Sequence, residues 1–114
     1  MDFPDRNVGE MQTSVFVKSG VQRIKPQFDD ITHIQGLKDY AIIYTHSAKI
    51  VIKGSIKAML DIFPKTAFLR VHKSFIVSIS KITRIEKNRI ALNGHQIPIG
   101  RNFREELEKV MGER

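Results

Sequence analysis

The sequence predicts a mainly β fold, in which sheets pack face to face and two short helices accompany them. Most of the chain consists of short segments in which apolar and polar residues alternate with a period of two, which is typical of strands. Turn-forming residues separate these segments at short intervals. Only two stretches have helical spacing, and strands and helices do not alternate as they do in a parallel α/β fold.

The first eleven residues differ from the rest of the chain. They have no periodicity and contain one proline, one glycine and three acids, a composition typical of linkers and frayed termini. We therefore predict a linker or disordered arm over residues 1–11 and one folded domain over residues 12–114. A chain of this length can bury a hydrophobic core without disulfides or metals.

The first strands of the domain are predicted from alternation between turn residues. Gly20 separates two short segments that are expected to pair as a hairpin, residues 14–17 and 21–24. A tight turn is expected at residues 28–31. The next strands are predicted over residues 31–34, 40–45 and 49–53, with turns at 36–39 and 46–47.

One helix is predicted in the middle of the chain. Ile56, Met59, Leu60 and Phe63 have the spacing i, i+3, i+4 and i+7, which places them on one helical face. Ser55 precedes this stripe and can cap the helix, and the proline at position 64 ends it. We interpret the stripe as core.

Strands resume after this helix, over residues 68–71 and 75–77. Residues 82–99 are predicted to form a meander, and its turn at Asn93-Gly94 is a strong hairpin signal because both residues tolerate positive φ. A final helix is then expected, with Asn102 as its N-cap and Glu105 completing a capping box. Its predicted apolar stripe consists of Phe103, Leu107, Val110 and Met111, and Gly112 is its expected end.

The composition argues against catalysis and against bound metals. The chain has no cysteine, which excludes disulfides, thiolate-zinc sites and cysteine nucleophiles. It contains no catalytic or phosphate-binding motif of known spacing, and no two of its four histidines have metal-ligand spacing. His33 is interpreted as structural and Asp29-Asp30 as a turn or cap. We predict that the protein is not an enzyme and needs no cofactor.

A membrane location is not expected either. The longest apolar run, residues 40–44, has five residues, whereas a spanning helix needs about 20. The acidic and polar N-terminus does not resemble a secretory signal. A cytoplasmic location is therefore predicted.

Positive charge is concentrated after residue 30. Residues 1–30 carry four Lys/Arg and five acids, and residues 31–114 carry 15 Lys/Arg and seven acids. A body this basic attracts polyanions such as nucleic acid. Several of its cations fall on predicted turns, where functional residues often gather: Lys38, the His72-Lys73 pair and Arg101. Arg70 alternates with apolar neighbours and is expected to pair within the protein.

The stretch from about Asp30 to Arg104 resembles the LytTR family, the DNA-binding output domain of many bacterial response regulators. The resemblance depends on the string Phe68-Leu69-Arg70-Val71-His72-Lys73-Ser74-Phe75-Ile76-Val77 and on Ile99-Gly100-Arg101 followed by a helix. Weaker matches in the same order are the Asp30–Gln35 start, the Lys38-Asp39-Tyr40 turn and the Gly54–Lys57 helix start.

This resemblance implies an elongated β-sandwich of antiparallel sheets whose loops enter successive major grooves. The family's three base-contacting positions fall on Asp39, Lys73 and Arg101. An acid at the first position can accept a hydrogen bond from cytosine but is repelled by phosphate, so Lys38 or Tyr40 is the alternative contact there. Further candidates near these positions are His72, Asn102 and Arg104.

The resemblance also implies the partners: double-stranded DNA with repeated half-sites, a second copy bound beside the first, and a receiver domain absent from this chain. The predicted function is therefore sequence-specific DNA binding by a bacterial transcriptional regulator. Two alternatives stay open. One is a basic β-domain that binds RNA or the ribosome, although its phenylalanines mostly fall in apolar stripes. The other is a protein-interaction module that pairs through a sheet edge.

Overall fold

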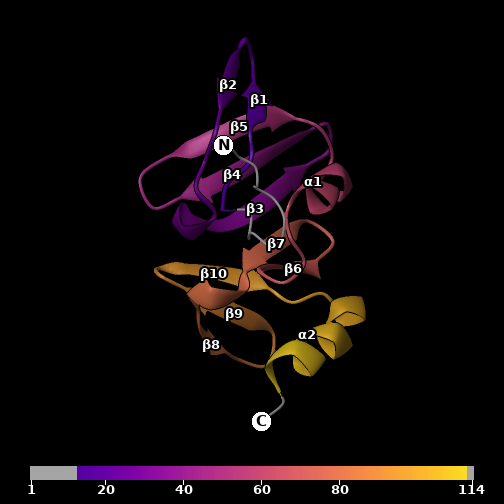
Figure 1. The fold of residues 1–114 in the computed structure, drawn as a ribbon. Coiled ribbons are helices and arrows are strands. Elements are labelled where there is room, and N and C mark those ends of the chain that lie inside the picture. The colour runs from indigo at the N-terminus through magenta and orange to yellow at the C-terminus, as the bar shows by residue number, and fades with distance from the viewer. Residues whose placement is uncertain (1–12, 113–114) are drawn as a thin grey trace, which may run out of the picture.

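The computed structural model describes residues 13–112, so the predicted linker over residues 1–11 lies outside the described residues. The described part contains ten strands and two α-helices, and its strands form three antiparallel sheets (Figure 1). The molecule measures 48 × 34 × 24 Å along its principal axes. The prediction of an elongated, mainly β fold with antiparallel sheets and two short helices is confirmed.

The first sheet is the predicted hairpin. Strand β1 (Val17–Ser19) pairs with β2 (Gln22–Ile24) around the turn at Gly20. The first strand begins later than expected, and Ser14 forms an isolated bridge to Gln27 outside it. A 3₁₀ turn over Phe28–Asp30 then leads into the next sheet.

The second sheet has five strands in the order β5-β4-β3-β7-β6. They are β3 (Ile31–Leu37), β4 (Tyr40–Thr45), β5 (Lys49–Lys53), β6 (Phe68–His72) and β7 (Phe75–Ser78). Strand β3 continues through Gly36, which was expected to lie in a turn. A Cβ atom on Gly36 would lie 2.7 Å from Cβ of Ile56, so glycine permits the close approach of the following helix to this strand.

The first helix, α1 (Ile56–Ile62), forms as predicted. The Ser55 hydroxyl accepts a 3.1 Å hydrogen bond from the Ala58 amide and so caps the helix. Its apolar face is buried over the sheet. Phe63, directly after the helix, contacts Phe28 and Phe68 with ring centroids 5.6 and 5.1 Å away.

The third sheet is the predicted meander, in the order β10-β9-β8. Its strands are β8 (Ile82–Ile85), β9 (Arg89–Leu92) and β10 (His95–Pro98). Asn93 and Gly94 connect the last two strands with φ values of 27° and 88°. Both residues occupy the left-handed region that this short hairpin turn requires.

Two hydrophobic cores meet at the β6–β7 hairpin. Phe68 and Ile76 point into the first core, which lies among the hairpin β1–β2, α1 and the five-stranded sheet. Val71 and Val77 point into the second core, with residues of the three-stranded sheet and Leu107. The hairpin is thus covered on both faces, which produces the sandwich.

The last helix, α2 (Arg104–Met111), begins differently from the prediction. A 3₁₀ turn over Arg101–Phe103 precedes it, and the Phe103 amide donates to the Gly100 carbonyl. Asn102 therefore lies inside a helical turn, is exposed, and is not the N-cap; Phe103 occupies that position without a side-chain cap. Leu107 is buried as predicted, but Val110 and Met111 are 40% and 37% exposed.

Candidate nucleic-acid interface

The strand pairing brings two of the three predicted contact turns together. Strand β3 ends at Leu37, and its antiparallel neighbour β7 begins at Phe75. The turn after β3, with Lys38, and the turn before β7, with Lys73, therefore lie at the same end of the sheet. A 2.8 Å hydrogen bond from the Gly36 amide to the Ser74 carbonyl joins them directly.

The third turn packs against the end of β6. The Gly100 amide donates to the Val71 carbonyl over 2.8 Å. A Cβ atom on Gly100 would lie 3.4 Å from the His72 Cα and 2.9 Å from the Phe103 ring, so the absence of a side chain lets the turn with Arg101 lie close to His72. Figure 1 shows the β3–β4 turn, α1 and the start of α2 along one side of the molecule.

A groove with a volume of about 310 Å³ lies between the first two turns and the start of α1. Its lining includes four cationic side chains and no acid: Lys38, Lys57, Arg70 and Lys73. Polar and apolar neighbours complete the lining, namely Gly36, Leu37, Ser55, Ile56 and Ser74. Side chains of this charge complement phosphate groups.

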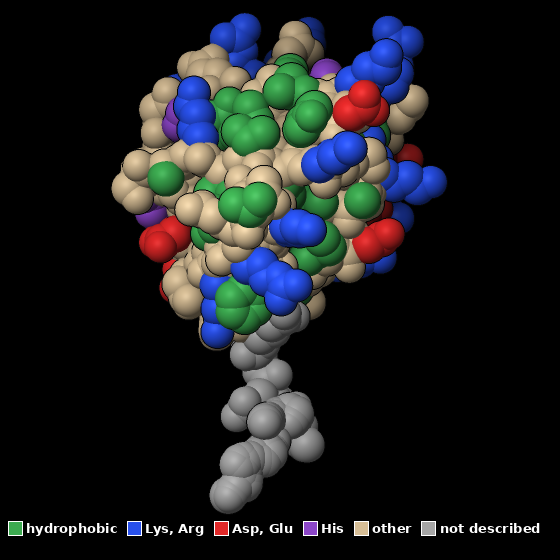
Figure 2. All heavy atoms as spheres, turned by 90° about the horizontal axis from the view of Figure 1, so that it is seen from above, with side chains coloured by type: hydrophobic (Ala, Val, Ile, Leu, Met, Phe, Trp, Pro, Cys, Tyr) green, Lys and Arg blue, Asp and Glu red, His purple; other side chains and the backbone are tan. Residues whose placement is uncertain are grey.

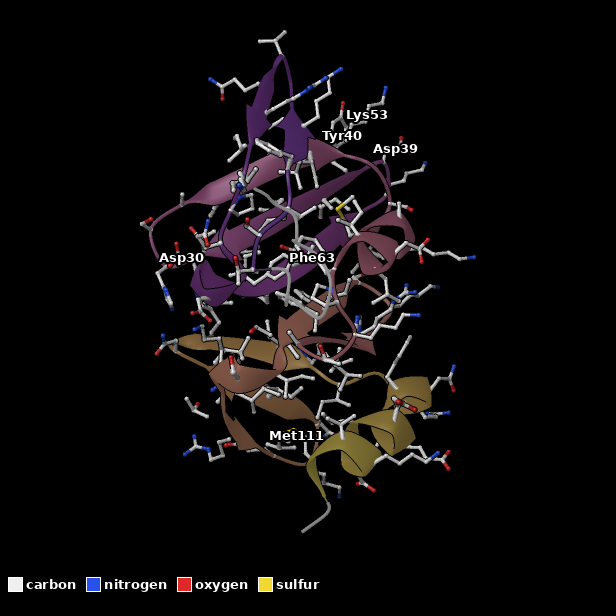
Figure 3. The ribbon with its side chains drawn as sticks, in the orientation of Figure 1. Asp30, Asp39, Tyr40, Lys53, Phe63 and Met111 are labelled. Carbon is white, nitrogen blue, oxygen red and sulfur yellow. The ribbon has the colours of Figure 1, made fainter. Side chains whose placement is uncertain are left out.

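The β3–β4 turn presents three predicted contacts to solvent. Lys38 has a φ of 27°, in the left-handed region, and is exposed together with Asp39. The Asp39 carbonyl accepts a 2.8 Å hydrogen bond from the Gly54 amide, which ties the turn to the end of β5. Tyr40 is 49% exposed and pairs with Lys53 across the strands. Figure 3 shows Asp39, Tyr40 and Lys53 at one end of the sheet.

Lys73 is exposed at the tip of the β6–β7 turn, whereas His72 is half-buried. The Ser74 amide donates a 3.0 Å hydrogen bond to Nδ1 of His72. The His72 ring also contacts the Phe75 ring, with centroids 5.6 Å apart. His72 therefore shapes the turn that carries Lys73.

The turn before α2 exposes Arg101 and Asn102. Arg104 is half-buried one position into the helix, and its Nη1 lies 3.6 Å from a carboxylate oxygen of Glu108. This i,i+4 pair stays on the helix surface, where such pairs contribute a few tenths of a kcal/mol, roughly 0.3–0.5. Of the two arginines in this segment, Arg101 is the more exposed to solvent.

Asp39 is an acid of this edge, whereas Asp30 lies away from it. Figure 3 shows Asp30 at the opposite end of the five-stranded sheet from Asp39. There Oδ1 of Asp30 lies 3.9 Å from Nδ1 of His46. Basic side chains also spread over the end of the molecule that carries the β1–β2 hairpin (Figure 2), where Lys18 and Arg23 are exposed. The edge that carries the three predicted contact turns, with its surroundings, is thus predominantly positive.

His33 lies apart from this edge and is structural, as predicted. It is 3% exposed, stacks on Tyr44 with ring centroids 4.3 Å apart, and lies 4.8 Å from the His95 ring. Burial, and then the nearby His95, lower the pKa of His33 to about 4. Across residues 13–112, no three His, Asp or Glu side chains come together in a way that could hold a metal ion.

Lys53 and Lys57 are not among the contacts predicted from the sequence. Strand register places Lys53 beside Tyr40, and the first turn of α1 brings Lys57 into the groove. The signal was available in part, because both residues flank the glycine and serine that start α1. The place of Lys53 beside Tyr40 and of Lys57 beside Lys73 depends on strand pairing, which spacing along the chain does not reveal.

Comparison with known proteins agrees with this geometry. The sequence model of the LytTr DNA-binding domain family matches residues 22–112. The solved structure of a LytTr DNA-binding domain from Bacillus cereus superimposes with a TM-score of 0.78, at 19% sequence identity, over 90% of this chain and all of that one. This second similarity concerns the fold.

Two curated relatives carry the name sensory transduction protein LytT. The protein from Bacillus cereus is 27% identical over 89 residues, which are 73% of this chain and 36% of that protein. The protein from Bacillus anthracis is 30% identical over 73 residues, or 59% of this chain and 27% of that protein. The chain thus spans about a third of the length of these relatives.

The match to the family model covers most of the chain and includes all three predicted contact turns. The family is defined by DNA binding and not by catalysis. No helix described for residues 13–112 has the length and apolarity to traverse a bilayer. By sequence and by fold, this chain belongs to the LytTr DNA-binding domain family.

Proposed function

We propose that this chain binds double-stranded DNA sequence-specifically, as the output domain of a bacterial transcriptional regulator. The convergence of the Lys38, Lys73 and Arg101 turns on one edge of the molecule carries the proposal. Exposed cations on rigidly held turns can reach both phosphates and base edges in a major groove.

Each turn has its own proposed role. Arg101 donates two hydrogen bonds to O6 and N7 of a guanine, a contact that discriminates by about 1–3 kcal/mol. Lys73 contacts a base or a phosphate as a point charge. At the first position, in the β3–β4 turn, Asp39 accepts a hydrogen bond from a cytosine amine, or Lys38 or Tyr40 makes the contact in its place. His72 shapes its turn, and Asn102 and Arg104 approach phosphates beside Arg101.

The partners follow from the same proposal. Two copies bind side by side on repeated half-sites, and a receiver domain, carried on the same or another polypeptide, controls them. The two relatives named as sensory transduction proteins, which are longer than this chain, support a link to signalling. The proposed location is the cytoplasm, where the DNA is.

Selection of bound duplexes from a random pool at near-physiological salt tests this function. We expect enrichment of a sequence repeated at a fixed spacing. Affinity for that duplex should also fall steeply with salt, since each neutralised phosphate releases counterions. Absence of any enriched sequence contradicts sequence specificity.

The same assay separates the alternatives. A single-stranded RNA that competes better than the enriched duplex indicates an RNA-binding domain. An affinity that does not change with salt indicates the protein-interaction module, because strand addition to a sheet edge depends on backbone hydrogen bonds.

A further inference from the structure

Arg70 lies on β6 between two of the contact turns, and its guanidinium touches both. Nη2 donates a 2.7 Å hydrogen bond to the Lys73 carbonyl, and Nε donates a longer one, of 3.4 Å, to the His72 carbonyl. The guanidinium also lies over the Phe103 ring, with its carbon 5.5 Å from the ring centroid. Phe103 belongs to the 3₁₀ turn that carries Arg101.

We propose that Arg70 is a positioning residue that fixes the Lys73 turn relative to the Arg101 turn. This inference depends on the proposed function, because it concerns how two DNA-reading side chains are held apart at a set spacing. Arg70 acts through the backbone of one turn and the aromatic ring of the other.

The chemistry of these contacts requires arginine. A planar guanidinium can donate in its own plane to two carbonyls while its face stacks on a ring, whereas a lysine ammonium offers one point charge without a face. Backbone contacts also hold these turns: the Ser74 amide donates to His72, the Gly36 amide to the Ser74 carbonyl and the Gly100 amide to the Val71 carbonyl. The Arg70 side chain adds contacts that extend from the Lys73 turn to the Phe103 ring.

The spacing between the Lys73 and Arg101 turns matters because hydrogen bonds to base edges form only within narrow limits of distance and angle. A hydrogen bond weakens steeply once its angle falls toward about 120°, so a turn that moves by an ångström loses contact with its base edge. Nonspecific attraction to phosphates tolerates such movement, since it depends mainly on charge. Loss of Arg70 positioning should therefore reduce discrimination between sequences more than it reduces binding to DNA in general.

A direct phosphate contact is the competing role, because Arg70 also lines the cationic groove with Lys38, Lys57 and Lys73. The variant Arg70→Lys separates the two roles, since it keeps the charge and removes the planar fork. Phe103→Leu is the second variant, because it keeps apolar packing and removes the ring face. Arg84→Lys on β8 is the matched control; Nε of Arg84 pairs with Glu86 over 3.0 Å, away from the groove.

The experiment measures Kd for the duplex that the wild-type protein enriches from a random pool and for a scrambled duplex of equal length. All four proteins are compared at several salt concentrations and below their melting temperatures. We expect Arg70→Lys to lower the ratio of the two affinities roughly tenfold, the effect of losing one charge-assisted hydrogen bond. Phe103→Leu should lower it about two- to fivefold, the effect of losing one cation–π contact. The salt slope and the affinity for the scrambled duplex should stay at wild-type values, and Arg84→Lys should change nothing.

The inference is overturned if Arg70→Lys keeps the wild-type ratio, which is the outcome for a phosphate contact. It is also overturned if Phe103→Leu keeps that ratio, because the link to the Arg101 turn is then absent. If the wild-type protein enriches no duplex, the failure lies in the proposed function and is recognised before any variant is made.

Discussion

The imidazole rings of His33 and His95 lie 4.8 Å apart across the boundary between the five-stranded and three-stranded sheets. His33 is buried and hydrogen-bonded through Nδ1 to the Thr32 hydroxyl, whereas His95 is exposed. Protonation of His33 would place a charge in a buried site beside a second titratable ring. The boundary between the sheets therefore requires His33 to be neutral.

The first prediction concerns the pH dependence of stability. The pKa of His33 is about 4 in the folded protein and 6.5 in the unfolded chain, so the unfolded chain binds the extra proton between these values. Stability is therefore fully present above pH 6.5 and is lost as the pH falls toward 4. The loss should be on the order of 3 kcal/mol, since one pKa unit corresponds to about 1.4 kcal/mol.

Urea unfolding followed by circular dichroism at pH 7 and pH 4.5 measures this loss. His33→Gln should flatten the pH dependence over this range. If the wild type and His33→Gln show equal pH dependence of stability, His33 is not the source of the loss.

The second prediction concerns Gly36. A methyl group there would lie 2.7 Å from Cβ of Ile56, so Gly36→Ala must push α1 away from β3. Overpacking of this kind costs about 1–3 kcal/mol. Denaturant unfolding should show this loss of stability, and Ser80→Ala, at an exposed position, provides the control. A Gly36→Ala protein as stable as the wild type would mean that the helix shifts without cost.

The third prediction concerns Lys73, which projects from the tip of its turn. Lys73→Ala should weaken binding to the enriched duplex about tenfold and reduce the salt slope by about one, because one phosphate or base contact with its counterion is lost. Fluorescence anisotropy with labelled DNA measures both quantities. Lys87→Ala, in the turn between β8 and β9, is the matched control. If Lys73→Ala binds the duplex as tightly as the wild type, Lys73 is a solvated surface residue that makes no contact with DNA.

The fourth prediction concerns Arg101. Arg101→Ala should relax the base preference at one position of each half-site, with a cost of about 1–3 kcal/mol against the preferred base. Selection from the random pool should then return every base at that position and keep the others. Arg84→Ala serves as the control for loss of a guanidinium. Unchanged selectivity would remove Arg101 from base readout.

Local patterns predicted most elements of the fold. The Asn93-Gly94 turn, the Ser55 cap and the stripe from Ile56 to Phe63 each depend on residues close in sequence, and the structure confirms them. Asn102 was wrongly predicted as a cap because an Asn before an apolar stripe fits that pattern equally well when a 3₁₀ turn intervenes.

Less of the candidate site than of the fold could be predicted from the sequence. The turn positions of Lys38, Lys73 and Arg101 were predicted, and their DNA contacts stay predictions. Two facts could not be read from spacing: the groove joins Lys57 to the other cations, and Arg70 contacts the Phe103 ring. Both depend on which strands are neighbours, a property of the assembled sheet.

The hairpin of β6 and β7 has a consequence for cooperativity. Val71 and Val77 face one core while Phe68 and Ile76 face the other. If either half of the molecule unfolds, the shared hairpin loses the hydrophobic packing on one of its two faces. We therefore expect one unfolding transition for the whole domain, with the slowest-exchanging amides on these two strands, directly behind the turn that presents Lys73.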